Sequence, residues 1–180
     1  MSTATETNAL TGSWEIDTTH STVGFTILYM GVAPFQGAFR EFEATVGEHG
    51  LRGVAKASSI DVDNDDLTAH LASPDFFDAA SHPELSIETG PLRREGSSIA
   101  VDGVLEIKGN RAPVSLTGTI TDAVSDPWGG RKLGLSLVGA VDKNDVGLTW
   151  NAPLPEGGSM LADEVELTAS LVLVPAREEA

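Results

Sequence analysis

The 180-residue sequence contains no cysteine, and basic side chains are scarce in it. Without cysteine the chain forms no disulfide and offers no thiolate, either as a nucleophile or as a zinc ligand. The sequence has 11 Lys and Arg residues against 27 Asp and Glu residues, which gives a formal net charge of -16 at pH 7. A surface of this sign repels phosphate backbones and anionic headgroups, so we expect no nucleic acid and no anionic membrane as partner.

Long hydrophobic runs are also missing. No apolar stretch approaches the roughly 20 residues that a membrane-spanning helix needs, so we expect no membrane span. Residues 1–12 are polar and contain neither the basic start nor the apolar centre of a secretory signal peptide. We therefore predict a flexible N-terminal tail over residues 1–12, one domain over residues 13–175, and a cytoplasmic location.

The pattern that dominates the sequence has a period of two. Over residues 114–121, for example, Val114 and Leu116 alternate with Ser115 and Thr117. Such alternation marks antiparallel strands with one buried and one solvated face. Further strands are expected over residues 14–16, 22–30, 38–46, 53–62, 85–92, 99–108, 132–141 and 164–173. With turn signals between them, about eight or nine strands predict an antiparallel barrel or a sandwich.

One segment interrupts the strand pattern. Asn64 or Asp65 can cap a short helix that carries Leu67 and Leu71 on one face. The sequence Ser-Pro-Asp at residues 73–75 favours the start of a second helix. We expect a helical flap between two strands, near one end of the sheet.

Small residues recur on the apolar strand faces, at Gly103, Gly118, Gly139 and Ala169. A solid core would fill such positions with bulkier side chains. Glycine there either relieves sheet curvature or marks a bulge, or else the sheet wraps around the volume of a ligand. Composition leaves both interpretations open.

Asp17, His20 and Ser21 invite comparison with a catalytic triad. Adjacent residues on a strand point to opposite faces, so His20 and Ser21 are poorly placed to share a proton. No glycine-flanked nucleophile turn is present either. We expect these residues to anchor a hairpin by hydrogen bonds.

Metal chemistry finds little support in the sequence. The histidines His20, His49, His70 and His82 lack the short spacing of metal ligands. The acidic residues between Asp61 and Asp66 lack the central glycine and terminal glutamate of a calcium loop, and they suit the start of a helix instead. We expect no metal site.

Aromatic residues mark the face that would carry a ligand. Phe25, Ile27 and Tyr29 share one strand face, and Phe35 and Phe39 share another. Each position is as consistent with a packed core as with the wall of a pocket. In a hollow barrel, core and pocket wall are the same face.

Several segments, taken in order along the chain, form a recognisable series. They are WEID at residues 14–17 with HSTVGFTI at 20–27, GV at 31–32 with GAFREF at 37–42, SID at 59–61, HLASPDFFD at 70–78 with HP at 82–83, VLEIKG at 104–109 with PV at 113–114, and GLTWN at 147–151 with DEV at 163–165. Over residues 13–174 this series resembles the YceI-like family of polyisoprenoid-binding proteins. The resemblance implies a lipocalin-like antiparallel barrel with an elongated cavity for an isoprenoid chain, and it also implies a homodimer in many members.

Two departures from the family pattern bear on the expected flap. Tyr29 precedes Met30 where the family usually has histidine, and Leu67-Thr68 stand where it usually has Arg-Asp. Both changes remove charge, so we expect headgroup recognition to differ from that of the family.

These observations predict an all-β, lipocalin-like antiparallel β-barrel of about eight strands with a short helical insertion. We expect it to bind, and to carry or sequester, a long apolar amphiphile such as a polyisoprenoid or a quinone precursor, without catalysis and without a cofactor. The residues expected to line the pocket are Phe25, Ile27, Tyr29, Phe35, Phe39, His70, Phe77, Leu105, Leu116, Leu135, Leu137, Trp150 and Met160. Tyr29, His70 and Arg111 are expected at its mouth.

Two other functions stay open at this point. One is an enzyme on the same barrel that acts on a small apolar substrate, with His20 or His70 as acid and base. The other is a ligand-free, stress-related interaction protein whose barrel is packed solid.

Overall fold

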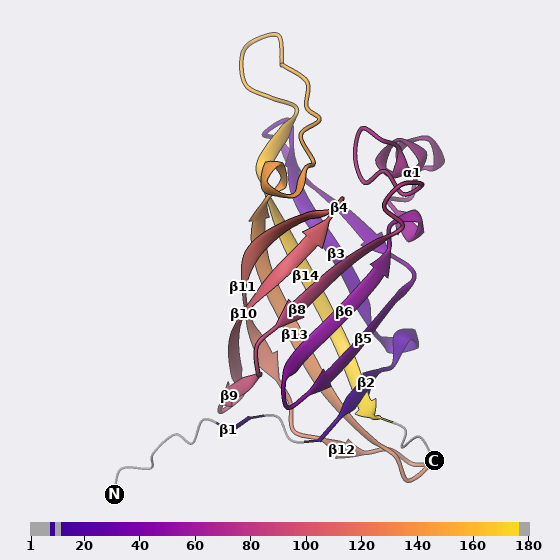
Figure 1. Ribbon diagram of the computed structural model, residues 1–180, viewed down its shortest axis with the longest axis vertical. Coiled ribbons are helices and arrows are strands. Elements are labelled where there is room, and N and C mark those ends of the chain that lie inside the picture. The colour runs from indigo at the N-terminus through magenta and orange to yellow at the C-terminus, as the bar shows by residue number, and fades with distance from the viewer. Residues whose placement is uncertain (1–7, 10–11, 177–180) are drawn as a thin grey trace, which may run out of the picture.

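The computed structural model describes residues 8–9 and 12–176, and its main feature is a closed antiparallel barrel (Figure 1). Most of the predicted tail over residues 1–12 lies outside the described residues. The described part includes β1 (Asn8–Ala9), which pairs with β9 (Arg93–Glu95) at one end of the barrel.

The barrel has eight strand positions, of which several are filled by two successive short strands. The split positions are β2 (Trp14–Ile16) with β3 (Thr22–Tyr29), β4 (Ala33–Phe39) with β5 (Phe42–Gly47), and β6 (Gly50–Lys56) with β7 (Ile60–Asp61). The continuous positions are β8 (Glu84–Thr89), β10 (Ser98–Ile107), β11 (Asn110–Ile120), β13 (Arg131–Asp142) and β14 (Leu161–Pro175). The short strand β12 (Val124–Ser125) pairs with β13 outside this ring.

Closure of the barrel depends on β14. This strand pairs with β13 along one side and with both β2 and β3 along the other. The ring continues from β13 through β11, β10, β8 and β6 to β5 and β2. The predicted antiparallel barrel of about eight strands with a short helical insertion is therefore confirmed.

Local breaks account for the differences between the expected and the observed strands. The strand predicted over residues 38–46 is wrong in its bounds, because β4 begins at Ala33 and the chain turns at Arg40 and Glu41. The backbone N–H of Arg40 donates to the Ser59 carbonyl at 3.0 Å, which ties this turn to the 3-10 helix η2 (Ala57–Ser59). The same helix divides the strand predicted over residues 53–62.

The predicted flap contains one helix and not two. Asn64 caps α1 (Asp65–Ala72), and its Oδ1 accepts the Leu67 N–H at 2.9 Å. The second helix, expected from residue 73, is absent, and residues 74–77 form hydrogen-bonded turns. The Phe77 N–H donates back to the Leu71 carbonyl at 3.0 Å, and Asp78 has a positive φ of 49°, so the chain folds under α1 without continuing a helix.

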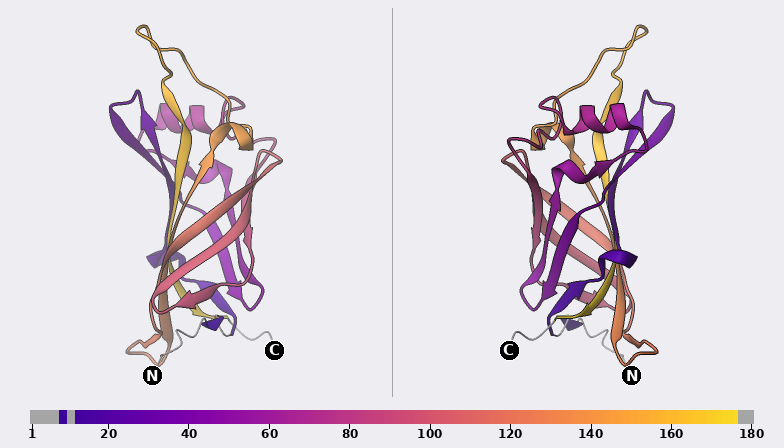
Figure 2. Two further views of the ribbon diagram at one scale, coloured as in Figure 1. Left: turned by 90° about the vertical axis from the view of Figure 1, so that its left-hand side faces the viewer. Right: turned by 90° about the vertical axis from the view of Figure 1, so that its right-hand side faces the viewer.

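The two ends of the barrel differ in what covers them (Figure 2). The open end carries α1, the β3–β4 hairpin and the loop over residues 147–160, whereas β12 and the C-terminal part of β14 lie at the closed end. Apolar side chains towards the closed end are buried almost completely, among them Val46, Leu92, Ile120, Leu135 and Leu173. Close packing at this end leaves the other half of the barrel as the place for a site.

Three glycines on the inner face have a structural explanation. A Cβ at Gly103 would lie 2.6 Å from the Glu88 carbonyl oxygen, and one at Gly139 would lie 2.7 Å from a Leu116 methyl group. A Cβ at Gly118 would collide with the backbone of β13. These glycines permit close approach of neighbouring strands.

Candidate functional site

The open end of the barrel leads into an apolar cavity of about 480 Å³. Inward-facing side chains of the strands form its wall, because alternate residues of a strand share one face. Phe25 and Ile27 of β3 lie on the wall, as do Leu137 and Val141 of β13. Small-molecule sites in proteins have volumes of roughly 300–1,000 Å³, and this cavity falls within that range.

One aromatic cluster in the cavity wall joins the strands to the flap. The ring centroid of Phe77, from the turn after α1, lies 5.5 Å from that of Phe39 and 6.3 Å from that of Phe25. Gly37 makes room for this arrangement, because a Cβ there would lie 2.5 Å from the Phe25 ring. The flap therefore contributes directly to the cavity.

A second cluster, consisting of His70, Phe76 and Trp150, lies at the mouth. The centroid distances among these rings are 5.1, 5.1 and 5.3 Å. His70 is 38% exposed at its side chain, and its Nε2 lies 3.1 Å from a carboxylate oxygen of Asp75. Near the rim, the Met30 N–H donates to the Met160 carbonyl at 2.7 Å and links β3 to the loop over residues 147–160.

Nearly all of the residues predicted to line the pocket lie on the cavity wall. They are Phe25, Ile27, Tyr29, Phe35, Phe39, His70, Phe77, Leu105, Leu116, Leu137, Trp150 and Met160. Their contact with a ligand stays a prediction, because the cavity wall fixes only their position.

Two of the predicted positions do not reach the cavity. Leu135 has an exposed fraction of 0%, and it packs at the closed end, where its register partners are Ile120 and Leu171. Arg111 lies opposite Glu106 on the outer face of the β10–β11 ladder and is exposed, so it does not belong to the mouth. Its inward-facing neighbour is Ala112, which is buried.

Lys143 is a wall residue that sequence reasoning missed. It begins the 3-10 helix η3 (Lys143–Val146), directly after β13, and only 3% of the residue is exposed. Its Nζ donates to the Leu148 carbonyl at 3.0 Å and to the Trp150 carbonyl at 3.3 Å. The signal was present in the alternation, because odd-numbered residues of β13 from Leu133 to Val141 face inward and Lys143 is the next in phase.

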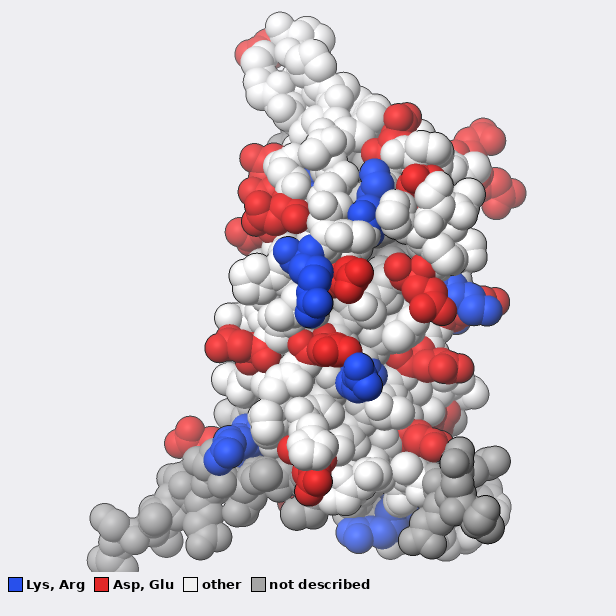
Figure 3. Space-filling model, viewed as in Figure 1, with Lys and Arg blue, Asp and Glu red and all other residues white. Residues whose placement is uncertain are grey.

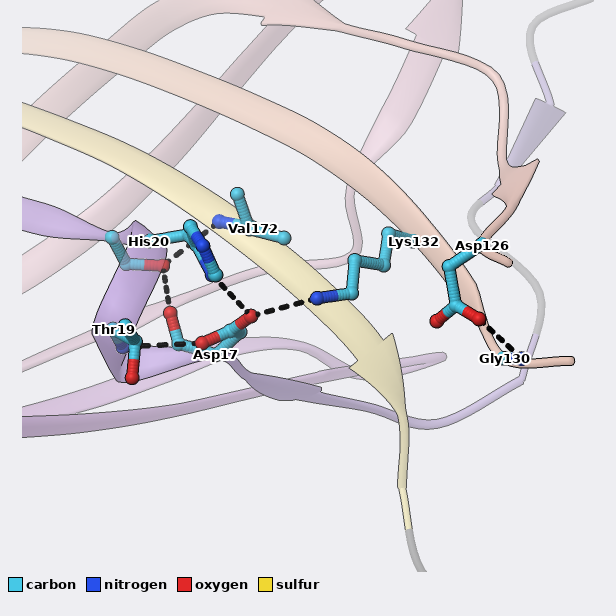
Figure 4. A network of polar contacts seen from close by, with 8 residues as sticks. Asp17, Thr19, His20, Asp126, Gly130, Lys132 and Val172 are labelled. Atoms are coloured by element: carbon cyan, nitrogen blue, oxygen red, sulfur yellow. Dashed lines mark hydrogen bonds and ion pairs between the residues drawn. The ribbon is translucent and has the colours of Figure 1, made fainter. Parts of the chain in front are cut away.

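Asp17, His20 and Ser21 form a structural network on the outside of the barrel. Figure 4 shows Asp17 and His20 with Lys132 and Val172. Asp17 Oδ2 lies 2.8 Å from His20 Nδ1 and 3.0 Å from Lys132 Nζ. Ser21 Oγ donates to the Asp17 carbonyl at 2.7 Å and accepts the Val172 N–H at 2.9 Å. The serine hydroxyl thus bonds to backbone groups and not to the imidazole, so these residues do not have the geometry of a triad.

The charge on Asp17 is stabilised by its neighbours. The hydrogen bond from His20, and then that from Lys132, lowers the pKa of Asp17 to about 2. The network pins η1 (Thr18–His20), which breaks the strand between β2 and β3, to β13 and β14. A turn in which Asp126 Oδ1 accepts the Gly130 N–H at 2.8 Å precedes the β13 segment that carries Lys132.

Charges of both signs cover the outer wall, with acidic side chains in excess (Figure 3). Arg52 bonds to Glu88 across β6 and β8 at 2.6 Å, and this hydrogen bond lowers the pKa of Glu88. The pKa of Asp61 is lowered by the backbone N–H of Asp63 and then by Arg40. These groups face solvent, in contrast to Lys143.

Two further properties concern the described chain as a whole. Among residues 8–9 and 12–176, no group of three or more His, Cys, Asp or Glu side chains is placed to hold a metal ion. Within the same residues, none of the helices combines the length and the apolar character needed to cross a bilayer.

Comparison with known proteins agrees with this architecture. Protein YceI of Salmonella arizonae is 25% identical over 173 residues, which cover 91% of this chain and 87% of that protein. The crystal structure of the Campylobacter jejuni YceI protein matches with a TM-score of 0.71 at 21% identity, covering 90% of this chain and 97% of the other. A polyisoprenoid binding domain from Saccharophagus degradans matches with a TM-score of 0.65 at 12% identity, covering 91% and 98%.

The likeness extends to a family model. The model of the YceI-like domain matches residues 14–173, which span the barrel from the start of β2 to Leu173 of β14. The family resemblance of the sequence is thereby confirmed. This chain belongs to the YceI-like domain family.

Proposed function

We propose that this protein binds a long apolar amphiphile, such as a polyisoprenoid, a quinone precursor or a related lipid, in the barrel and carries or sequesters it. The observation that carries the proposal is the cavity of about 480 Å³ with its almost wholly apolar wall. Removing apolar surface from water contributes about 25 cal/mol per Å², so such a wall favours a hydrocarbon chain over a polar ligand.

The size of the cavity suits a chain of moderate length. Its volume of about 480 Å³ lies within the roughly 300–1,000 Å³ of small-molecule sites. A longer chain would extend through the open end, where Tyr29 and Met30 are each 40% exposed. The name of the Saccharophagus degradans domain, a polyisoprenoid binding domain, supports the same ligand class.

The geometry of the cavity bears on the two alternative functions, a ligand-free protein and an enzyme. A barrel packed solid does not agree with the cavity, which removes the basis of the ligand-free alternative. An enzyme on this barrel would have to use His70, because His20 lies on the outer network and not on the cavity wall. Among the described residues, the side-chain hydrogen-bond partner of His70 is Asp75, which does not line the cavity, so we favour binding without a covalent step.

Organic extraction of the purified protein, followed by mass spectrometry, tests the proposal. We expect a prenyl lipid or a related amphiphile at close to one molecule per chain. Delipidated protein should then bind added farnesol, measured by displacement of the neutral dye Nile red. A protein that yields no lipid and binds neither farnesol nor the dye would overturn the proposal.

A further inference from the structure

The cavity wall includes one residue that a purely apolar ligand does not explain, the buried Lys143. Lysine is almost never fully buried unless it is paired with an opposite charge. Among the described residues, Lys143 forms no ion pair, whereas Lys56 pairs with Glu41 and Lys132 pairs with Asp17 on the outside of the barrel. The Lys143 side chain is therefore held inside without a carboxylate partner within 4.0 Å among the described residues.

The hydrogen bonds of Lys143 leave part of its bonding capacity unused. An ammonium group has three N–H donors. Two of them donate to the carbonyls of Leu148 and Trp150, and the part of the chain that the structure describes supplies no third acceptor. Any further acceptor that reaches a buried ammonium group stabilises it. An anionic acceptor stabilises it most, because burial strengthens charge-assisted hydrogen bonds.

The position of Lys143 relates it to the mouth. It follows the last cavity-facing residue of β13, Val141, and its bond to the Trp150 carbonyl places it beside the aromatic cluster of the mouth. The apolar wall formed by Phe25, Leu105 and Leu137 continues from there into the barrel. An amphiphile can thus place its chain against the wall and its headgroup beside the ammonium.

We propose that Lys143 anchors an acidic headgroup, so that the ligand is an amphiphile ending in a carboxylate or a phosphate. This inference rests on the proposed function, and it adds the charge of the headgroup to the nature of the chain. The acidic outer surface does not attract such a ligand, and at 0.15 M ionic strength its influence is screened beyond about 8 Å. Selectivity for the acid then comes from Lys143, the buried lysine of the wall.

The experiment compares ligands that share one chain and differ in the headgroup. Farnesoic acid, methyl farnesoate, farnesol and farnesyl phosphate are titrated against the delipidated protein by displacement of Nile red at pH 7.5. Wild type is expected to bind the acid or the phosphate about 10- to 100-fold more tightly than the methyl ester, which is the effect of one charge-assisted hydrogen bond. The acid and the phosphate compared with each other identify which anion is preferred.

Variants assign the preference to one side chain. Lys143→Met should abolish the preference for the acid while binding of the ester changes by less than about threefold, and Lys143→Arg should retain the preference. Lys56→Met is the matched control, because Lys56 pairs with Glu41 on the outer wall and should leave every affinity unchanged. Far-UV circular dichroism checks the fold of each variant, and the comparison of acid with ester in wild type needs no variant at all.

The possible failures are distinct. Equal affinity of wild type for farnesoic acid and its methyl ester would overturn the anchor and leave the lipid carrier intact. A preference for the acid that survives in Lys143→Met would also overturn the anchor. Failure of all four ligands to bind would overturn the proposed function itself.

Discussion

At the scale of single residues, Asp17 shows how one carboxylate fixes the place where a strand breaks. Its side chain accepts from the Thr19 N–H, from His20 and from Lys132, and it is only 17% exposed. Its pKa of about 2 lies below the ordinary value of 3.8, so the folded state favours the ionised form. By linkage, this preference stabilises the folded protein.

Replacement of Asp17 by Asn should lower the free energy of unfolding at pH 7 by about 2 kcal/mol, the equivalent of the pKa shift. Because the folded-state pKa is depressed, the contribution is complete above pH 4 and is lost as the pH falls toward 2. The difference in urea-unfolding free energy between wild type and Asp17→Asn should therefore shrink over this window. The other carboxylates are common to both proteins and cancel in the difference.

Asp122→Asn is the control for this measurement. Asp122 pairs with Arg94 at 3.0 Å, but its side chain is 89% exposed, and exposed ion pairs contribute little to stability. The stability of Asp122→Asn should stay close to that of wild type from pH 7 to pH 2. If the difference in unfolding free energy between wild type and Asp17→Asn stays constant down to pH 2, the assigned role of Asp17 is wrong.

At the scale of the elements, α1 and the turns after it form one side of the mouth. The helix has only eight residues, so its own hydrogen bonds hold it weakly and its ends matter. Asn64 supplies the N-terminal cap, and Leu71 and Phe77 pack the element onto the core. A change at Asn64 therefore reaches the mouth without touching the cavity wall.

Substitution of Asn64 by Ala should cost about 1 kcal/mol, because it leaves the Leu67 N–H without its acceptor. Hydrogen exchange of the amides in α1 should be faster by about fivefold, and the exchange in β13 should not change. Asn64→Ser keeps a capping oxygen and should behave as wild type. Equal protection of α1 in the Ala and Ser variants would contradict the role of the cap.

The sequence predicts these elements to different degrees, for physical reasons. Alternation predicted the inner faces of β10, β11, β13 and β14, and the Asn64 cap predicted α1, because both signals are local. The breaks at η1 and η2 and the missing second helix depend on bonds to distant segments, such as Phe77 N–H to the Leu71 carbonyl. The alternation does not mark Lys143 as a wall residue although its phase points inward, because a charged residue interrupts the apolar run on which that prediction depends.

At the scale of the whole molecule, the barrel combines a packed end with a hollow end. The alternation pattern does not distinguish the packed end from the hollow end. Leu135 and Leu137 share one face of β13, but of these two only Leu137 reaches the cavity. Which inward residues meet a cavity depends on where the strands lie along the barrel, and register sets that position. The hollow part is consequently a property of the closed sheet and not of any single strand.

Filling the cavity from its wall should separate binding from folding. Ala169 of β14 lies on the wall between its register partners Leu137 and Val23, so Ala169→Phe places a ring in the cavity. We expect the affinity for farnesol to fall by at least about tenfold, because the ring occupies the space and apolar area of the chain. Urea unfolding should show stability equal to or above that of wild type, because the ring contacts apolar side chains on all sides.

Ala140 provides the matched control on the same sheet. It is exposed on the outer face of β13, opposite Glu166, so Ala140→Phe adds the same ring outside the barrel. Affinity for farnesol should then equal that of wild type in the Nile red assay. If Ala169→Phe binds farnesol as tightly as Ala140→Phe does, the ligand lies outside the cavity, and the barrel interior is not the binding site.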